Sequence, residues 1–144
     1  TGDGEYKSVL SQLGITDGNG LDDSSVILPY LHDMPKALAA ADLAVFRSGA
    51  IGLAELAVRG IPSVLVPYPY AAEDHQTYNA RIFVQEGAAH MIVDQMLSAH
   101  DLIGEIEMFM ANRDLLAQMG DRALQLGKPN AAHDIAKLAL SIAK

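Results

Sequence analysis

Residues 46–55 combine small residues, a hydroxyl group and a carboxylate in a pattern that suits the binding of a phosphorylated ligand. A short apolar run precedes them and a helical pattern that ends at Gly60 follows, so we predict a strand, a tight turn and a helix. Ser48 is expected to cap this helix, and Gly49 and Gly52 are expected to leave the backbone open to a ligand. The unpaired N–H groups and the positive end of the helix dipole would then attract an anion.

One face of this helix is expected to carry polar groups. The residues on that face, at spacings of four, three and four, are Ser48, Gly52, Glu55 and Arg59. Glu55 would lie one to two turns behind the phosphate site, where a carboxylate can accept hydrogen bonds from a ribose diol. In the simpler alternative, Glu55 and Arg59 form an ordinary surface pair. The opposite side is expected to offer three apolar side chains to a core, namely Ile51, Ala54 and Val58.

The composition indicates a globular domain and argues against some classes of binding partner. The chain has 144 residues, of which 50% are hydrophobic, which is enough for a core. Its formal net charge of −8 argues against non-specific binding to nucleic acid and against attraction to an anionic membrane surface. The lack of cysteine excludes a disulfide framework, a thiolate metal site and a cysteine nucleophile. No apolar run is long enough to predict a membrane-spanning helix.

Short apolar runs alternate with helical patterns along the first two thirds of the chain. The predicted strands are residues 26–28, 43–46, 61–67 and 90–93. The predicted helices between them are residues 5–13, 34–41, 50–59 and 74–86, with a loop over residues 14–25. Three further helices, over residues 98–110, 115–126 and 131–143, are expected to pack around the end of the sheet. The alternation predicts an α/β fold, a Rossmann-like parallel sheet flanked by helices on both faces.

Ligands bind such sheets at the carboxyl ends of the strands, which here brings three loops to one rim. These loops are residues 29–33, 47–52 and 68–79. The third contains His75, Gln76 and Asn79 at a helix start, where amide and imidazole groups suit a hydroxyl-rich or phosphorylated ligand. In the simpler alternative, Asp74 caps that helix, Gln76 is solvated and Asn79 bonds a nearby loop. The residues by themselves favour neither interpretation.

Several short segments resemble the MurG-type family of transferases in order and spacing. They are Arg47-Ser48-Gly49-Ala50 with Glu55, Gly60-Ile61-Pro62, Val66-Pro67, His75-Gln76 with Asn79-Ala80, and Glu86-Gly87-Ala88-Ala89. The resemblance covers the chain from its start to near its end. It implies the donor-binding C-terminal half of an inverting GT-B glycosyltransferase, which moves N-acetylglucosamine from UDP-GlcNAc onto lipid I to form lipid II.

The resemblance also implies how the nucleotide is held. Leu31 matches a position whose backbone contacts the uracil, and Glu55 matches the carboxylate that binds the ribose hydroxyls. Ala50 and Ile51 match the helix-start amides that meet the diphosphate. His75 and Gln76 match a Gln-Gln or His-Gln pair that contacts the donor sugar in the family.

We expect no cofactor and no metal ion. The acidic residues do not form a metal cluster in the sequence, because they lie in separate segments, at Asp22, Asp23, Asp33 and Asp74. The histidines at positions 32, 75, 90, 100 and 133 are scattered, and none is a convincing base. The resemblance places the catalytic base and the lipid I site in an N-terminal acceptor domain. It implies a peripheral enzyme on the cytoplasmic face of the bacterial inner membrane, with no membrane contact through this chain.

The chain begins without methionine and without a leading strand, which favours one UDP-sugar-binding domain over residues 1–144, truncated from a longer enzyme. Two alternatives remain at this point. The chain could be a stand-alone nucleotide-sugar-binding subunit that meets a separate acceptor-binding partner, as in split eukaryotic transferases. It could also be a non-catalytic α/β module that uses its rim for protein contacts, which UDP titration would distinguish from the other two.

Overall fold

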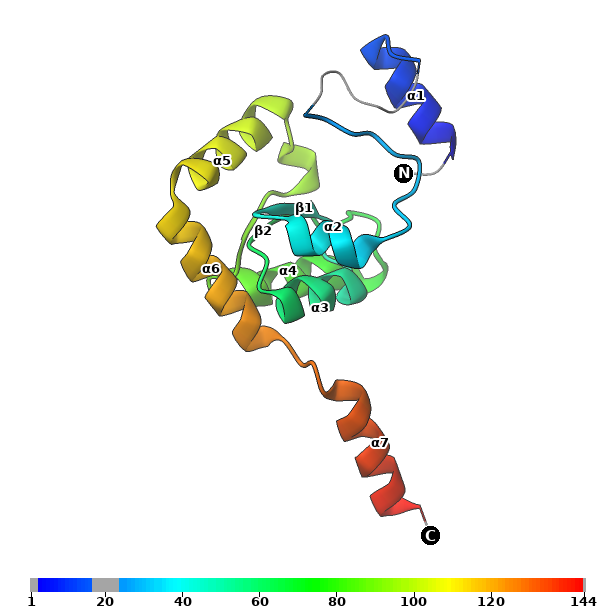
Figure 1. Cartoon of the computed structure of the whole chain (residues 1–144), viewed down its shortest axis with the longest axis vertical. Helices are drawn as coiled ribbons and strands as arrows, with labels where there is room; N and C mark the ends of the chain where they lie inside the picture. The colour runs from blue at the N-terminus through cyan, green and yellow to red at the C-terminus, as the bar shows by residue number, and fades with distance from the viewer. Residues whose placement is uncertain (1–2, 17–23, 144) are drawn as a thin grey trace. The chain divides into compact units, whose positions relative to one another are not determined.

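The computed structural model describes residues 3–16 and 24–143, and the chain divides into two compact units, Thr1–Ala37 and Leu38–Lys144 (Figure 1). Helix α1 (Asp3–Leu13) lies in the first unit and confirms the helix that the apolar spacing predicts there. Helix α2 (Met34–Ala40) spans the boundary between the units, and Asp33 caps it through a 3.3 Å hydrogen bond from the Lys36 N–H. Most of the predicted loop over residues 14–25, including Asp22 and Asp23, lies outside the described residues.

The prediction of a strand at residues 26–28 is wrong. This segment forms no regular secondary structure, and Val26 and Leu28 are 70% and 47% exposed. A strand needs a hydrogen-bonded neighbour, and the described sheet does not pair with this segment. Three consecutive apolar residues before Pro29 are therefore too weak a signal for a strand by themselves.

The second unit contains a three-stranded parallel sheet in the order β1-β2-β3. The strands are β1 (Ala44–Phe46), β2 (Ser63–Leu65) and β3 (Ala89–Met91), which confirms the three later strand predictions in shortened form. Val45 pairs with Val64, which in turn pairs with His90. The central strand is buried throughout, whereas β1 exposes Val45 and β3 exposes His90. The carboxyl ends of all three strands therefore meet at one rim.

Two of the remaining helices lie between the strands, which confirms the expected alternation, and three more follow β3. They are α3 (Ala50–Arg59), α4 (His75–Gln85), α5 (Ala99–Ala111), α6 (Arg113–Leu126) and α7 (Ala131–Ile142), with short 3₁₀ turns η1 (Ala72–Asp74) and η2 (Asp94–Met96). Ser98 caps α5 as expected, because its Oγ accepts a 3.1 Å hydrogen bond from the Asp101 N–H. The Asp101 carboxylate accepts the Ser98 hydroxyl proton in return, at 2.6 Å.

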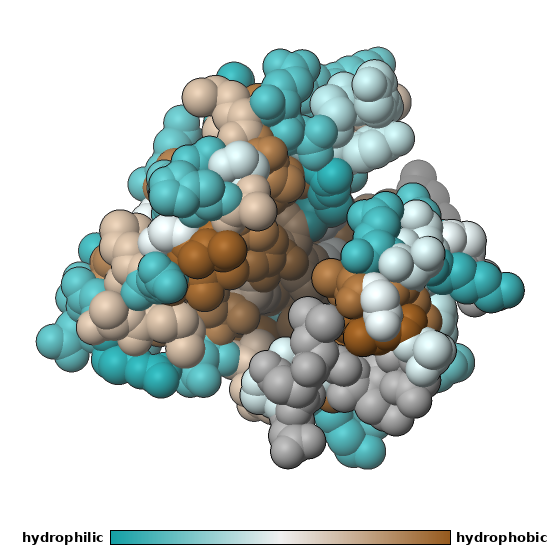
Figure 2. All heavy atoms as spheres, turned by 90° about the horizontal axis from the view of Figure 1, so that it is seen from above, coloured by the Kyte–Doolittle hydropathy of each residue, from teal (hydrophilic) through white to brown (hydrophobic). Residues whose placement is uncertain are grey.

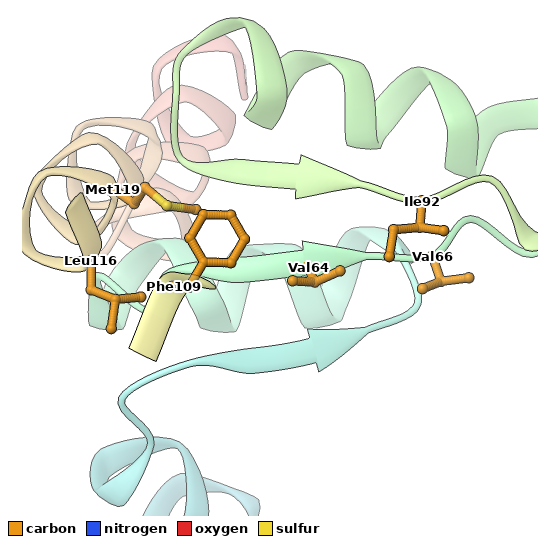
Figure 3. Packing of buried hydrophobic residues seen from close by; sticks show 6 residues of the cluster. All are labelled: Val64, Val66, Ile92, Phe109, Leu116 and Met119. Carbon is orange, nitrogen blue, oxygen red and sulfur yellow. The ribbon is translucent and has the colours of Figure 1, made fainter. Parts of the chain in front are cut away.

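The hydrophobic core lies between the sheet and the helices. One cluster on the α5–α6 side consists of Val64, Val66, Ile92, Phe109, Leu116 and Met119 (Figure 3). Because side chains alternate along a strand, Ser63 and Leu65 point to the opposite face, on which α3 and α4 lie (Figure 1). Leu65 of β2 and Leu56 of α3 are both fully buried. The sheet is thus covered on both sides, as the α/β prediction requires.

Helix α3 buries a different face from the one expected. Ile51 is 80% exposed and Val58 is 45% exposed, whereas Leu53, Leu56 and Ala57 are buried. The apolar residues of this helix cover most of its circumference, so spacing alone could not select the buried side. Contact with α6 selects it, because the two helices pack closely along their length.

Two glycines allow α3 and α6 to approach. Gly60 ends α3 in the left-handed conformation, with φ 66°, and its carbonyl oxygen would lie 2.7 Å from a Cβ placed on Gly120. We expect Gly120→Ala to lower the free energy of unfolding by about 1–3 kcal/mol, because this backbone oxygen cannot move aside easily. Gly104→Ala in α5 is the matched control, since a Cβ there meets nothing within 4 Å. Urea unfolding measures both variants, and equal effects of the two changes would contradict this packing.

Helix α7 does not pack around the end of the sheet, contrary to expectation. It buries no residue, and Leu138 and Leu140 are 63% and 77% exposed. Hydrophobic side chains also lie exposed among hydrophilic ones on the face seen in Figure 2. Of the helices in the described ranges, none is long and apolar enough to cross a membrane.

Candidate functional site

The start of α3 is open at the rim. Gly49 is the N-cap residue, with φ −68° and ψ 144°, and no side chain caps the helix. Within the described part of the chain, the N–H groups of Ala50, Ile51 and Gly52 donate to no protein acceptor. Ala50 and Ile51 are exposed, so these donors and the positive end of the helix dipole are accessible to an anion.

The two glycines of this turn have different roles. A Cβ on Gly49 would meet nothing within 4 Å, which leaves the approach to the helix open as predicted. A Cβ on Gly52 would lie only 3.0 Å from the Phe46 ring, so Gly52 allows that ring to pack against the helix. The sequence could not distinguish these roles, because they depend on where the ring of the preceding strand lies.

Ser48 is not the helix cap that its position suggested. It is fully buried, and its Oγ donates a 2.8 Å hydrogen bond to the carbonyl oxygen of Gln76. Asn79 Nδ2 donates to the Ser48 carbonyl oxygen at 3.2 Å. These two bonds tie the turn after β1 to the start of α4. Ser48 and Asn79 therefore brace the rim, which bears out the simpler interpretation of Asn79.

Gln76 connects the same region to the loop after β2. Its Oε1 accepts a 3.0 Å hydrogen bond from the Tyr68 N–H, so the side chain is not simply solvated. Because the oxygen is occupied in this way, the Nε2 group remains as a hydrogen-bond donor at the rim.

His75 begins α4 beside a strained turn. Its Nδ1 lies 2.7 Å from the Ala72 carbonyl oxygen, which can only accept, so the neutral ring carries its proton on Nδ1 and leaves Nε2 as an acceptor. Glu73 and Asp74 both adopt a left-handed conformation with φ 53°. Asp74 stands at the N-cap position but makes no capping bond to the backbone. Its carboxylate instead accepts the Thr77 hydroxyl at 2.6 Å.

Glu55 stands on α3 one turn beyond Ile51. It is exposed, and no hydrogen bond or ion pair joins it to another residue in the described ranges, Arg59 included. The simple surface pair is therefore not formed. The free carboxylate lies on the same helix face as Ile51, since the two are four residues apart.

Sequence reasoning placed Arg47 in a rim loop without giving its side chain a role, and it missed Asp94. Arg47 Nη1 donates to Asp94 Oδ1 and to the carbonyl oxygens of Val66 and Pro67, the latter two at 3.2 Å. The loop after β3, where Asp94 lies, could have been added to the rim by the same carboxyl-end rule that selected the other loops. The link to Arg47 could not be predicted, because it joins residues 47 positions apart.

A pocket of about 270 Å³ opens beside this ion pair. Its walls come from the loop after β2, the first turns of α4 and the loop after β3. The lining residues are Pro67, Pro69, Asp74, Thr77, Arg81, Met91, Val93, Asp94 and Gln95. None of the site residues selected from the sequence lines it. No group of three or more potential metal ligands comes together within residues 3–16 and 24–143.

The structure brings most of the expected site residues to one rim. Ser48, Gln76 and Asn79 are joined by hydrogen bonds, and Ala50, Ile51 and Glu55 follow on the adjoining helix. Leu31 belongs to the other compact unit, and its contact with a uracil stays a prediction.

A parallel sheet covered by helices, with an open helix start at the carboxyl ends of its strands, defines an α/β domain of the Rossmann-like class. Comparison with known families identifies it further. The model of the glycosyltransferase family 28 C-terminal domain matches residues 1–138. The chain therefore belongs to this family, and its fold is that of the C-terminal domain of a GT-B glycosyltransferase.

Individual relatives support this assignment. A UDP-N-acetylglucosamine--N-acetylmuramyl-(pentapeptide) pyrophosphoryl-undecaprenol N-acetylglucosamine transferase from Thermoanaerobacter sp. is 39% identical over 142 residues, which cover 99% of this chain and 39% of the relative. The enzyme of the same name from Desulforamulus reducens is 41% identical over 141 residues, covering 95% of this chain and 37% of the relative. The crystal structure of Acinetobacter baumannii MurG matches with a TM-score of 0.80 and 28% identity, covering 98% and 40% of the two chains. This chain thus spans about two fifths of the length of these relatives.

Proposed function

We propose that this chain is the donor-binding part of an inverting N-acetylglucosaminyltransferase that uses UDP-GlcNAc and forms lipid II from lipid I. The observation that carries the proposal is the open start of α3 followed by an unpartnered Glu55. This arrangement offers N–H donors to a diphosphate and a carboxylate to a ribose diol. Relatives whose names state this transferase activity match nearly the whole chain.

The diphosphate is assigned to Ala50 and Ile51. Their exposed amides and the helix dipole stabilise negative charge without a metal ion or a basic side chain. The same groups would stabilise the charge that develops on the leaving UDP during transfer. Ser48 and Gly49 contribute by shaping this turn, since the Ser48 hydroxyl is occupied by Gln76.

The donor sugar is assigned to His75 and Gln76 at the start of α4. In the tautomer with its proton on Nδ1, the His75 ring offers Nε2 as an acceptor, and Gln76 offers Nε2–H donors, so the pair can bind a hydroxyl group from both sides. Asn79 supports this pair by holding the turn after β1 at 3.2 Å. Leu31 is assigned to the uracil through its backbone.

The rest of the reaction is assigned to an acceptor domain outside these 144 residues, and residues 1–144 are proposed to act as one UDP-sugar-binding domain. That acceptor domain would supply the catalytic base and hold lipid I. Because lipid I carries a polyprenyl chain, we infer that the complete enzyme works at a membrane, and the family resemblance implies the cytoplasmic face of the inner membrane.

Calorimetric titration with UDP tests the donor site directly. We expect weak, saturable binding of UDP by the purified chain, because the opposing domain that would close on the nucleotide is absent. ADP serves as the matched control, since it has the same diphosphate and ribose but a different base. Absence of heat at saturating UDP would contradict the proposed function and favour a non-catalytic module. Equal affinities for ADP and UDP would show that this chain does not distinguish uracil from adenine.

A further inference from the structure

The side chain of Arg47 joins the three loops that follow the strands. Arg47 itself comes directly after β1, and its Nη1 donates to the carbonyl oxygens of Val66 and Pro67 after β2, each at 3.2 Å. The same nitrogen donates to the Asp94 carboxylate, which follows β3. One guanidinium group therefore fixes the relative positions of all three loops at the rim.

The contacts of Arg47 continue to the start of α4. Its Cζ lies 5.7 Å from the centroid of the Tyr68 ring, within the range of a cation–π contact. The Tyr68 N–H in turn donates to Gln76 at 3.0 Å. The next residue in the chain, Ser48, holds the start of α4 through its hydroxyl and carbonyl groups. The turn before α3 is therefore bonded to the loops after β2 and β3 through Arg47 and to α4 through Ser48.

Asp94 gives this arrangement its orientation. The Asp94 carboxylate accepts a charge-assisted hydrogen bond from Arg47 and so holds the planar guanidinium in one position. In that position the guanidinium donates to the two carbonyl oxygens. The Asp94 side chain is only 28% exposed, compared with 50% for Arg47. All three contacts come from Nη1, whose two N–H groups the three acceptors share and whose position the planar guanidinium fixes, whereas a lysine would carry its charge on a flexible stem.

We propose that Arg47 and Asp94 form a clamp that positions the α3 amides for the diphosphate, with Arg47 acting as a positioning residue. This inference rests on the proposed function, because it assigns the clamp to the same nucleotide site. The alternative is that the pair stabilises the loops without affecting the ligand. In that case, changes at Arg47 would alter the unfolding midpoint and leave nucleotide affinity unchanged.

The test compares UDP affinity and thermal unfolding of the whole 144-residue chain and its variants. We expect Arg47→Lys to weaken UDP binding about tenfold, because the charge remains but the loops are no longer held together. Asp94→Asn is expected to have a smaller effect in the same direction. The double variant should bind UDP no more weakly than Arg47→Lys alone, since both changes disable one clamp.

Arg113→Lys is the matched control. Arg113 and Asp42 form another exposed arginine–aspartate pair in the same unit, at 3.2 Å, away from the rim residues. Arg113→Lys should therefore leave UDP affinity unchanged. A thermal midpoint for Arg47→Lys close to that of Arg113→Lys, together with tenfold weaker UDP binding, supports a positioning role.

Unchanged UDP affinity in Arg47→Lys, or additive effects in the double variant, would overturn the clamp while leaving the proposed function intact. Failure of the unaltered chain to bind UDP would overturn the proposed function and the clamp together. If Arg47→Lys does not fold, the UDP affinity of Asp94→Asn tests the clamp instead. This variant is expected to fold, because the Asp94 side chain is near the surface and asparagine has the same shape. Unchanged UDP affinity in Asp94→Asn would then refute the clamp.

Discussion

The purified 144-residue chain is expected to bind UDP-GlcNAc and to transfer no sugar to a lipid I analogue. Inverting transfer requires a base that deprotonates the acceptor hydroxyl and a site that holds acceptor and donor in line. Holding two reactants in this way supplies about 7–11 kcal/mol of barrier reduction, a factor of about 10⁵–10⁸ in rate. A donor site alone cannot supply this term, although the α3 amides can still stabilise the leaving UDP.

The base that this reaction needs is assigned to the acceptor domain. His75 donates through Nδ1 to the Ala72 carbonyl oxygen, and its remaining ring nitrogen, Nε2, is assigned to the donor sugar. Transfer of labelled N-acetylglucosamine to a lipid I analogue measures the activity. Addition of an acceptor domain, in cis or in trans, should restore it. Transfer by the purified chain alone would refute the assignment of the base to that domain.

Glu55→Ala, tested in a full-length enzyme that carries this domain, is expected to weaken donor binding without unfolding the protein. Hydrogen bonds to a charged group contribute about 1.5–3 kcal/mol each, so loss of the ribose contact should raise the donor KM about 10–150-fold. Glu55 is exposed and has no partner in the described ranges, so its removal leaves no buried group unpaired. The free energy of unfolding should change by less than about 0.5 kcal/mol.

Two further variants make the Glu55 experiment specific. Glu107→Ala removes another exposed glutamate, on α5, and should leave the donor KM unchanged. Glu55→Gln keeps the shape of the side chain and removes its charge, so its donor KM should lie between those of the unaltered enzyme and Glu55→Ala. If Glu55 served only as a surface partner, stability would fall by less than about 1 kcal/mol and the donor KM would not change. An unaltered donor KM in Glu55→Ala would decide against the ribose contact.

The sequence was sufficient for the elements whose signals are local. Helix α3 begins and ends where expected, because Gly60 supplies a left-handed C-terminal residue and the apolar spacing before it is helical. Strand β2 was predictable because its apolar run lies between Pro62 and Pro67. The strand predicted at residues 26–28 failed because a strand also depends on a neighbour, which the run itself does not specify.

The roles of individual site residues depended on contacts between distant parts of the chain. Ser48 has the residue type and position of a helix cap, yet its hydroxyl bonds Gln76, 28 residues away. The buried side of α3 was set by α6 through the approach of Gly60 and Gly120. Arg47 was expected in a rim loop and in a family motif, but the role of its side chain could not be predicted, because its partner Asp94 comes two strands later. Such side-chain pairs cannot be read from spacing along one element.

The central claim is that the open start of α3 binds the diphosphate of a uridine nucleotide. Chemical-shift mapping of the ¹⁵N-labelled chain during titration with UDP tests it most directly. The account predicts that the amides of Ala50, Ile51 and Gly52 shift progressively and saturate, whereas those of α7 remain unchanged. Saturation of the chain with UDP without any shift at these three amides would contradict it.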